Sequence, residues 1–171
     1  LEGGTPPPPP PADPLVVMND FTTHMAGKHY QNGITGKGKD VTRYILRGST
    51  KAAAAAALPD GSVNLFAGLR IGVPSGTNPT PLTVKGLEVD MSEVLHDCNG
   101  IAWFPGNEIS VIDVRVKGAR GSSSTPPGET SLLNLNRHTK VLIDNCDIDG
   151  RASGTAVAAT GINLSRSKNI T

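Results

Sequence analysis

The short acidic stretch at residues 145–150 has the residue types and spacing of a metal-binding loop. It reads N-x-D-x-D-G, which is close to the start of an EF-hand calcium loop, where oxygens at alternate positions converge on one hard cation. Such a loop also needs a bidentate glutamate at its twelfth position. This chain has Ala156 there. We therefore predict no calcium site, and the acidic residues need another explanation.

A glycine-rich stretch, Gly33–Asp40, comes close to a phosphate-binding loop. It matches G-x-x-x-x-G-K-[ST] except at Asp40, which stands where the motif has a hydroxyl residue. This change removes the magnesium ligand and places a carboxylate near the phosphates. The residues that follow, VTRYIL, have the pattern of a strand, whereas the motif must open a helix. We interpret the stretch as a glycine-rich turn.

The remaining candidates are histidines and an aromatic pair. The histidines are His24, His29, His96 and His138, and they have neither the H-x-H nor the H-x-x-x-H spacing of a metal pair. The stretch 93–97, EVLHD, is either an acid and base cluster or a solvated loop. Trp103 and Phe104 suggest a platform for stacking a sugar ring, but the repeat described below favours a core position for Trp103 and exposure for Phe104.

Carboxylates and thiols also lack a decisive pattern. Cleavage of a glycoside usually needs two carboxylates about 5 to 9.5 Å apart, and Asp113 and Asp144 are possible members of such a pair. No serine or cysteine has the local signature of a nucleophile, so we assign no catalytic residue, cofactor or metal ligand. Cys98 and Cys146 match no zinc or redox spacing. Free thiols are favoured, and a disulfide stays open.

Composition and charge narrow the class of protein that must position these residues. The chain has 171 residues, of which 37% are hydrophobic and 4% aromatic, with 20 glycines and 14 prolines. This profile suits one domain of short strands joined by turns. The net charge of +1 indicates neither nucleic acid nor an anionic membrane as a partner. No apolar run approaches the roughly 18 residues of a membrane span, so no membrane insertion is expected.

Apolar residues repeat along the chain with the spacing Φ-x-Φ-x-x-Φ-x-Φ, where Φ is apolar. One copy starts at Ile109, 27 residues after the copy at Leu82 and 32 residues before the copy at Val141, and Ile170 starts another. The three full copies are Leu82, Val84, Leu87 and Val89; Ile109, Val111, Val114 and Val116; and Val141, Ile143, Cys146 and Ile148. A shorter pattern runs between them, as Leu69-x-Ile71, Ile101-x-Trp103, Leu133-x-Leu135 and Ile162-x-Leu164.

The repeat predicts an all-β fold, namely a right-handed parallel β-helix, or solenoid. Side chains alternate along a strand, so Φ-x-Φ buries one face. The extra residue in the middle of the longer copy allows a corner that keeps both apolar halves inward. Repeating this unit stacks one coil on the next. A β-sandwich of unrelated strands is the alternative.

The outward positions of the repeat explain the acidic stretch. Asp147 and Asp149 align with Arg115 and Lys117 one coil earlier, and these align with residues 88 and 90, a Glu and an Asp. Stacked strands lie about 4.8 Å apart, so opposite charges become direct neighbours. Exposed ion pairs contribute only about 0 to 1 kcal/mol each. We therefore expect these charges to specify register rather than to hold the fold together.

The chain divides into three expected regions. Residues 1–14 contain the proline run Pro6–Pro11, typical of a stiff linker or of a ligand for a proline-binding groove. Residues 15–60 form a cap segment with a short helix over the alanines at 52–57, either part of the β-helix or a separate cap. Residues 61–171 form the coils. Because the chain begins without Met and stops inside an expected strand, we expect it to belong to a longer protein.

The segments GIAWFPGNEISVIDVRVKG and LLNLNRHTKVLIDNCDIDG resemble coils of the pectate-lyase-like β-helix superfamily. With GITGKGKDVTRYIL, GLRIG and the proline-rich lead, they are similar to minor tail proteins and tailspikes of phages infecting actinobacteria. The resemblance implies an extracellular, virion-associated homotrimer that meets cell-surface polysaccharide and joins other tail proteins through its N-terminal region. It transfers no catalytic motif. The expected function is structural and host-binding; the alternative is a polysaccharide depolymerase, a glycoside hydrolase or lyase with a carboxylate-lined groove.

Overall fold

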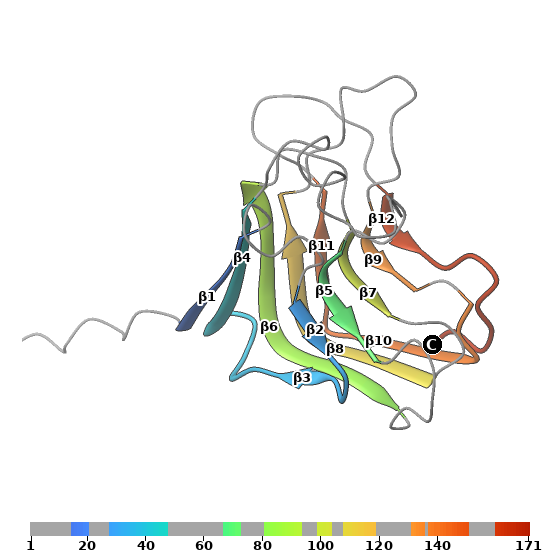
Figure 1. The fold of residues 1–171 in the computed structure, drawn as a ribbon. Coiled ribbons are helices and arrows are strands. Elements are labelled where there is room, and N and C mark those ends of the chain that lie inside the picture. Colours follow the sequence, from blue (N-terminus) through green and yellow to red (C-terminus); the bar gives the residue numbers. More distant parts are fainter. Residues whose placement is uncertain are drawn as a thin grey trace, which may run out of the picture.

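The computed structural model describes residues 15–20, 28–47, 67–72, 81–93, 99–103, 108–118, 131–135, 137–150 and 160–171 (Figure 1). These residues form β-strands and no helix, which confirms the all-β prediction for this part of the chain. The strands are β1 (Leu15–Asp20), β2 (Lys28–Tyr30), β3 (Ile34–Thr35), β4 (Thr42–Arg47), β5 (Ala67–Ile71), β6 (Leu82–Glu93), β7 (Asn99–Trp103), β8 (Glu108–Lys117), β9 (Ser131–Asn134), β10 (Lys140–Asp144), β11 (Asp147–Asp149) and β12 (Thr160–Asn163). The described residues accordingly offer no helix able to span a membrane.

The strands form two sheets in which every pairing between described strands is parallel. Sheet A has the order β1-β4-β6-β8-β10, with β3 also paired to β6 and β11 to β8. Sheet B has the order β12-β9-β7-β5-β2. The chain visits the two sheets alternately, with β3 and β4, and likewise β10 and β11, forming one visit to sheet A. Neighbours within each sheet are therefore successive visits of the chain (Figure 1).

The register of the strands confirms the spacing of the sequence repeat. In sheet A, Ile109 lies opposite both Leu82 and Val141, and Val141 forms a bridge with Ile170. In sheet B, the repeated pairs also lie side by side, since Ile101 pairs with Leu133. Equivalent apolar residues 27 to 32 positions apart are thus neighbours across the hydrogen-bonded ladders.

The extra residue of the longer repeat forms a corner in sheet A. Gly86, Asp113 and Asn145 occupy this position and have φ angles of 65°, 54° and 51°. Glycine adopts this left-handed conformation freely, and Asn and Asp tolerate it better than most residues. β6 changes direction between its two halves (Figure 1), while β10 and β11 form the two sides of the equivalent corner. The predicted corner is confirmed.

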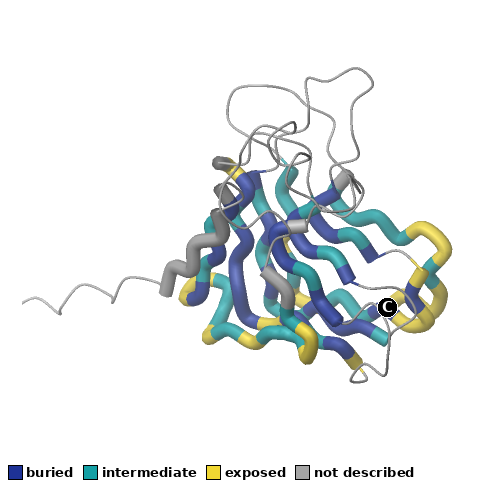
Figure 2. Tube along the Cα trace, in the orientation of Figure 1, coloured by how far each residue is buried: buried dark blue, intermediate teal, exposed yellow. Residues whose placement is uncertain are grey.

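The hydrophobic core lies between the two sheets. Its fully buried residues include Leu69, Leu82, Val84, Leu87, Val89, Ile101, Val111, Val114, Val116, Leu133 and Val141. Figure 2 shows this burial along the strands of both sheets. Trp103 is 6% exposed and belongs to this core, as predicted. Burying one such side chain contributes roughly 1.5 to 3 kcal/mol, so this apolar stack dominates the stability of the fold.

The cap segment contributes strands to both sheets. β4 pairs with β6, and β2 pairs with β5. The hydroxyls of Tyr30 and Tyr44 are hydrogen bonded, and their rings meet edge to face at 6.1 Å, which joins the two sheets. The described part of residues 15–60 therefore continues the two sheets. The linker at 1–14 and the alanine helix expected at 52–57 lie outside the described residues.

Candidate functional site

Charged side chains gather on the outer face of sheet A, beside the corner described above. The group, called the charged corner below, comprises the charged residues Lys39, Asp40, Arg43, Glu88, Asp90, Asp113, Arg115, Lys117 and Asp147, together with the uncharged amide of Asn145. Its members come from β4, β6, β8 and β11 and from the turns before β4 and β11. The parallel register brings together residues that are far apart in the sequence.

The outward columns predicted from the repeat are present in sheet A. Arg115 lies in register with Glu88 on one side and Asp147 on the other. Its guanidinium approaches both carboxylates at 3.2 Å. In the next column Lys117 is in register with Asp90, at 3.5 Å between Nζ and Oδ2. The alternation of acid and base across neighbouring strands is confirmed.

Glu88 departs from the expected exposed ion pairs. Its side chain is only 2% exposed and meets three cations: Arg43 Nε at 2.6 Å, Lys117 Nζ at 3.0 Å and Arg115 at 3.2 Å. The Arg43 contact is an ion pair without the alignment of a hydrogen bond. Because a buried charge is costly unless it is paired, these cations are required by the burial of Glu88. The expectation that the outward charges form exposed ion pairs is wrong for this residue.

The glycine-rich segment Gly36–Val41, called the strap below, folds over the corner. Gly36 and Gly38 donate their N–H groups to the carbonyls of Lys85 and Gly86, both at 2.8 Å. A Cβ at Gly36 would overlap the Gly86 carbonyl oxygen, so this close approach requires glycine. The predicted glycine-rich turn is confirmed for residues 36–40, whereas residues 34 and 35 within the predicted stretch form β3. The N–H groups of the two glycines bind the backbone of β6.

The strap carries two charges that reach past β6. Lys39 Nζ lies 2.9 Å from the Asn145 carbonyl oxygen, 3.2 Å from Asp147 Oδ2 and 3.9 Å from Asp113 Oδ1. The neighbouring carboxylate of Asp40 lies 2.8 Å from Arg115. Asn145 and Asp147 of the N-x-D-x-D-G stretch therefore contact an ammonium group supplied by the same chain.

Electrostatic contacts shift the pKa values of several members of the charged corner. Hydrogen bonds from Lys39 and then Arg115 lower the pKa of Asp147. Burial raises the pKa of Asp90, but hydrogen bonds from Ser92 and the charge of Lys117 outweigh it, so the net pKa is lowered. Bonds to Asp40 and Glu88 raise the pKa of Arg115 above its usual value. All these shifts favour the charged forms.

No family model, curated protein or solved structure matches this chain. Because one fold can host many functions, the contacts of the described residues carry the chemical part of a functional proposal.

The two carboxylates considered for glycoside cleavage have different surroundings. Asp113 accepts hydrogen bonds from Asn145 Nδ2 at 3.1 Å and from the Lys39 backbone N–H at 3.3 Å. Asp144 is exposed on β10, in register with Ile112. Among the described residues, no hydrogen bond links Asp113 to Asp144, and no Lys or Arg contacts both carboxylates. No group of three or more His, Cys, Asp or Glu in the described residues is placed to hold a metal ion.

The remaining candidates from the sequence are histidines, cysteines and an aromatic residue. Some lie within the two sheets or their turns, and the others lie outside the described residues. His138 is 1% exposed, and its backbone N–H bonds Ser167 Oγ at 3.0 Å. Cys146 is a free thiol whose pKa is raised by burial, which disfavours the reactive thiolate. Only the backbone of His29 is described, in β2. The candidates outside the described residues are His24, His96, Cys98 and Phe104.

Sequence reasoning missed three members of the charged corner, namely Lys39, Asp40 and Arg43. Arg43 lies opposite Glu88, but the signal for it in the sequence is weak, because polar Thr42 and apolar Ile45 break the apolar alternation that L-E-V-D-M has. The strap lengthens the repeat and hides that alignment. Nothing in the strap itself indicates which strands it crosses.

Proposed function

We propose that this chain is a structural, host-surface-binding component of a phage tail, built as a right-handed parallel β-helix. The alternation of the chain between two parallel sheets supports the helical winding, since each pair of visits makes one coil. Parallel crossovers are right-handed in about 98% of cases, which supports the handedness. The association with a phage tail rests on the resemblance of the coil sequences to tailspikes and minor tail proteins.

The ion pairs, burial and lowered pKa values of the carboxylates at the charged corner favour a structural role over a catalytic one. Glu88, Asp90, Asp113 and Asp147 each lie within 4 Å of a Lys or Arg. A general acid in glycoside cleavage needs a raised pKa and access to the substrate. Asp90 and Asp147 instead have lowered pKa values, and Glu88 is buried. These carboxylates support the stack and do not supply an acid and base pair.

The proposed partners follow from the same resemblance. The chain assembles as a homotrimer on the virion, joins other tail proteins through its N-terminal region and contacts cell-surface polysaccharide. A stack of parallel strands with a continuous core suits this role, because it gives a stiff element with a long lateral surface.

The test measures binding and cleavage together on the purified full chain. The probes are cell walls and isolated surface polysaccharides from a panel of actinobacteria. We expect co-sedimentation with at least one glycan, no release of reducing ends, and a solution mass of three chains by light scattering.

Each outcome bears on a different part of the proposal. Release of reducing ends would replace the structural role with the depolymerase alternative, and product unsaturation would then distinguish a lyase from a hydrolase. Absence of binding to every glycan would overturn the host-surface role. A monomeric mass would overturn the trimer alone.

A further inference from the structure

The strap connects strands that are not neighbours in sheet A. The order β4-β6-β8 places β6 between β4 and β8, and β11 pairs with β8 on its far side. Lys39, just before β4, nevertheless contacts Asp147 at the start of β11. Asp40 likewise crosses β6 to reach Arg115 on β8. The strap therefore adds contacts beyond those of the hydrogen-bonded ladder.

Such contacts matter because stacked repeats are otherwise coupled only through their immediate neighbours. In an array of that kind, one end can open while the other stays folded. We propose that the strap is an ionic clasp that couples opening of the β3–β4 region to opening of β11, so that these layers of sheet A open together. The proposal uses the strand pairings and side-chain contacts directly and does not depend on the phage-tail role.

The charges form an alternating chain that closes on itself. Lys39 pairs with Asp147, Asp147 with Arg115, and Arg115 with Asp40, the residue covalently next to Lys39. Shifting the strap by one residue would bring either Lys39 toward Arg115 or Asp40 toward Asp147, depending on the direction of the shift. Either contact would be repulsive, so the pattern selects one seating of the strap.

The seating is also anchored by backbone bonds. Gly36 and Gly38 bond the backbone at the corner of β6, and the Lys39 N–H bonds the Asp113 carboxylate. The side chain of Lys39 is 13% exposed, whereas that of Asp147 is 51% exposed. Water and salt therefore reach the clasp from the Asp147 side. At 1 M salt the screening length falls to about 3 Å, so the clasp can be loosened without unfolding the core.

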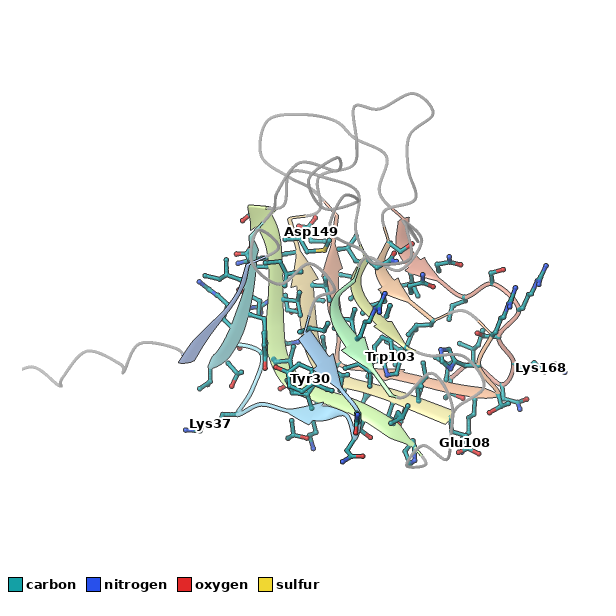
Figure 3. The ribbon with its side chains drawn as sticks, in the orientation of Figure 1. Tyr30, Lys37, Trp103, Glu108, Asp149 and Lys168 are labelled. Carbon is teal, nitrogen blue, oxygen red and sulfur yellow. The ribbon has the colours of Figure 1, made fainter. Side chains whose placement is uncertain are left out.

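Amide hydrogen exchange of the full chain, followed by mass spectrometry, tests the coupling. Lys39→Met removes the ammonium and keeps the aliphatic stem. Lys37→Met is the matched control, because Lys37 is exposed, points away from the sheets (Figure 3) and has no ion pair among the described residues. We expect peptides covering both the strap and β11 to exchange on the order of fivefold faster in Lys39→Met. The control should exchange like the wild type.

Two further measurements separate a specific clasp from general weakening. Asp147→Asn should accelerate strap exchange in the wild type but have a smaller effect in a Lys39→Met background, because the partner is already lost. In 1 M NaCl, wild-type exchange of the strap should approach that of Lys39→Met. Faster exchange confined to the strap, with β11 unchanged, would overturn the coupling. Equal effects of Lys39→Met and Lys37→Met, or additive effects of Lys39→Met and Asp147→Asn, would overturn the ionic contact as its cause.

Discussion

The ammonium of Lys39 lies 3.2 Å from the carboxylate of Asp147, although Lys39 precedes β4 and Asp147 begins β11. This contact answers the question raised by the N-x-D-x-D-G stretch. Oxygens of Asn145 and Asp147 do contact a cation, but that cation is a lysine side chain from the strap. The acidic residues therefore complete an ion-pair network across stacked strands.

Replacing Glu88 by Gln should be strongly destabilising. The buried carboxylate of Glu88 balances Arg43, Arg115 and Lys117, and removing one partner of a buried ionic group costs about 3 to 5 kcal/mol. Urea unfolding followed by the fluorescence of Trp103 would measure the change in free energy. Glu108→Gln, at a partly exposed position of β8, should change it by less than about 1 kcal/mol. Equal effects at the two positions would contradict the central role of Glu88.

The protein should lose stability in acid through Asp147 and Asp90. Their folded-state pKa values are lowered, so their contribution is present above the unfolded value of about 3.9. It is lost as the pH falls through the lower folded values. The urea midpoint should therefore decline below about pH 4, and less steeply in Asp147→Asn than in the wild type. An identical decline in both proteins would exclude Asp147 as a contributor.

Gly86→Ala should destabilise the corner by about 2 kcal/mol or more. Gly86 has a φ of 65°, and an added Cβ would lie 3.0 Å from backbone atoms of both Gly36 and Gly38. Gly161→Ala is the matched control, because its Cβ would meet only Ile148 Cγ2 at 3.5 Å. Thermal unfolding of the two variants should differ clearly. Similar melting temperatures would mean that the strap does not pack closely on Gly86.

Leu87 and Leu142 test the inward and outward assignment of the strands. Leu87 is fully buried in the core, whereas Leu142 is partly exposed on the outer face of β10. Leu→Ala at a core position costs about 2 to 5 kcal/mol, so Leu87→Ala should lower the unfolding free energy by that amount. Leu142→Ala should have a much smaller effect. A larger loss at Leu142 would reverse the assigned faces of sheet A.

Much of the fold follows from residues 82 to 170 alone. The alternation of apolar residues predicts which side chains are buried, because successive side chains of a strand point to opposite faces. The constant spacing between copies predicts which strands are neighbours, and the registers of Ile109 and Ile101 confirm this. Even the corner at Asp113 follows from one extra residue in the pattern.

The sequence by itself thus determined the strands, their buried faces and the columns in which Arg115 and Lys117 meet acidic neighbours. Only the tertiary structure decided that Glu88 is buried and that Lys39 closes the charged corner. The physical reason is that the contacts of Lys39 join strands that are not neighbours in the sheet. A periodic pattern specifies neighbours within a ladder, whereas the path of a glycine-rich strap depends on close backbone approach and on charges contributed by strands that are not adjacent.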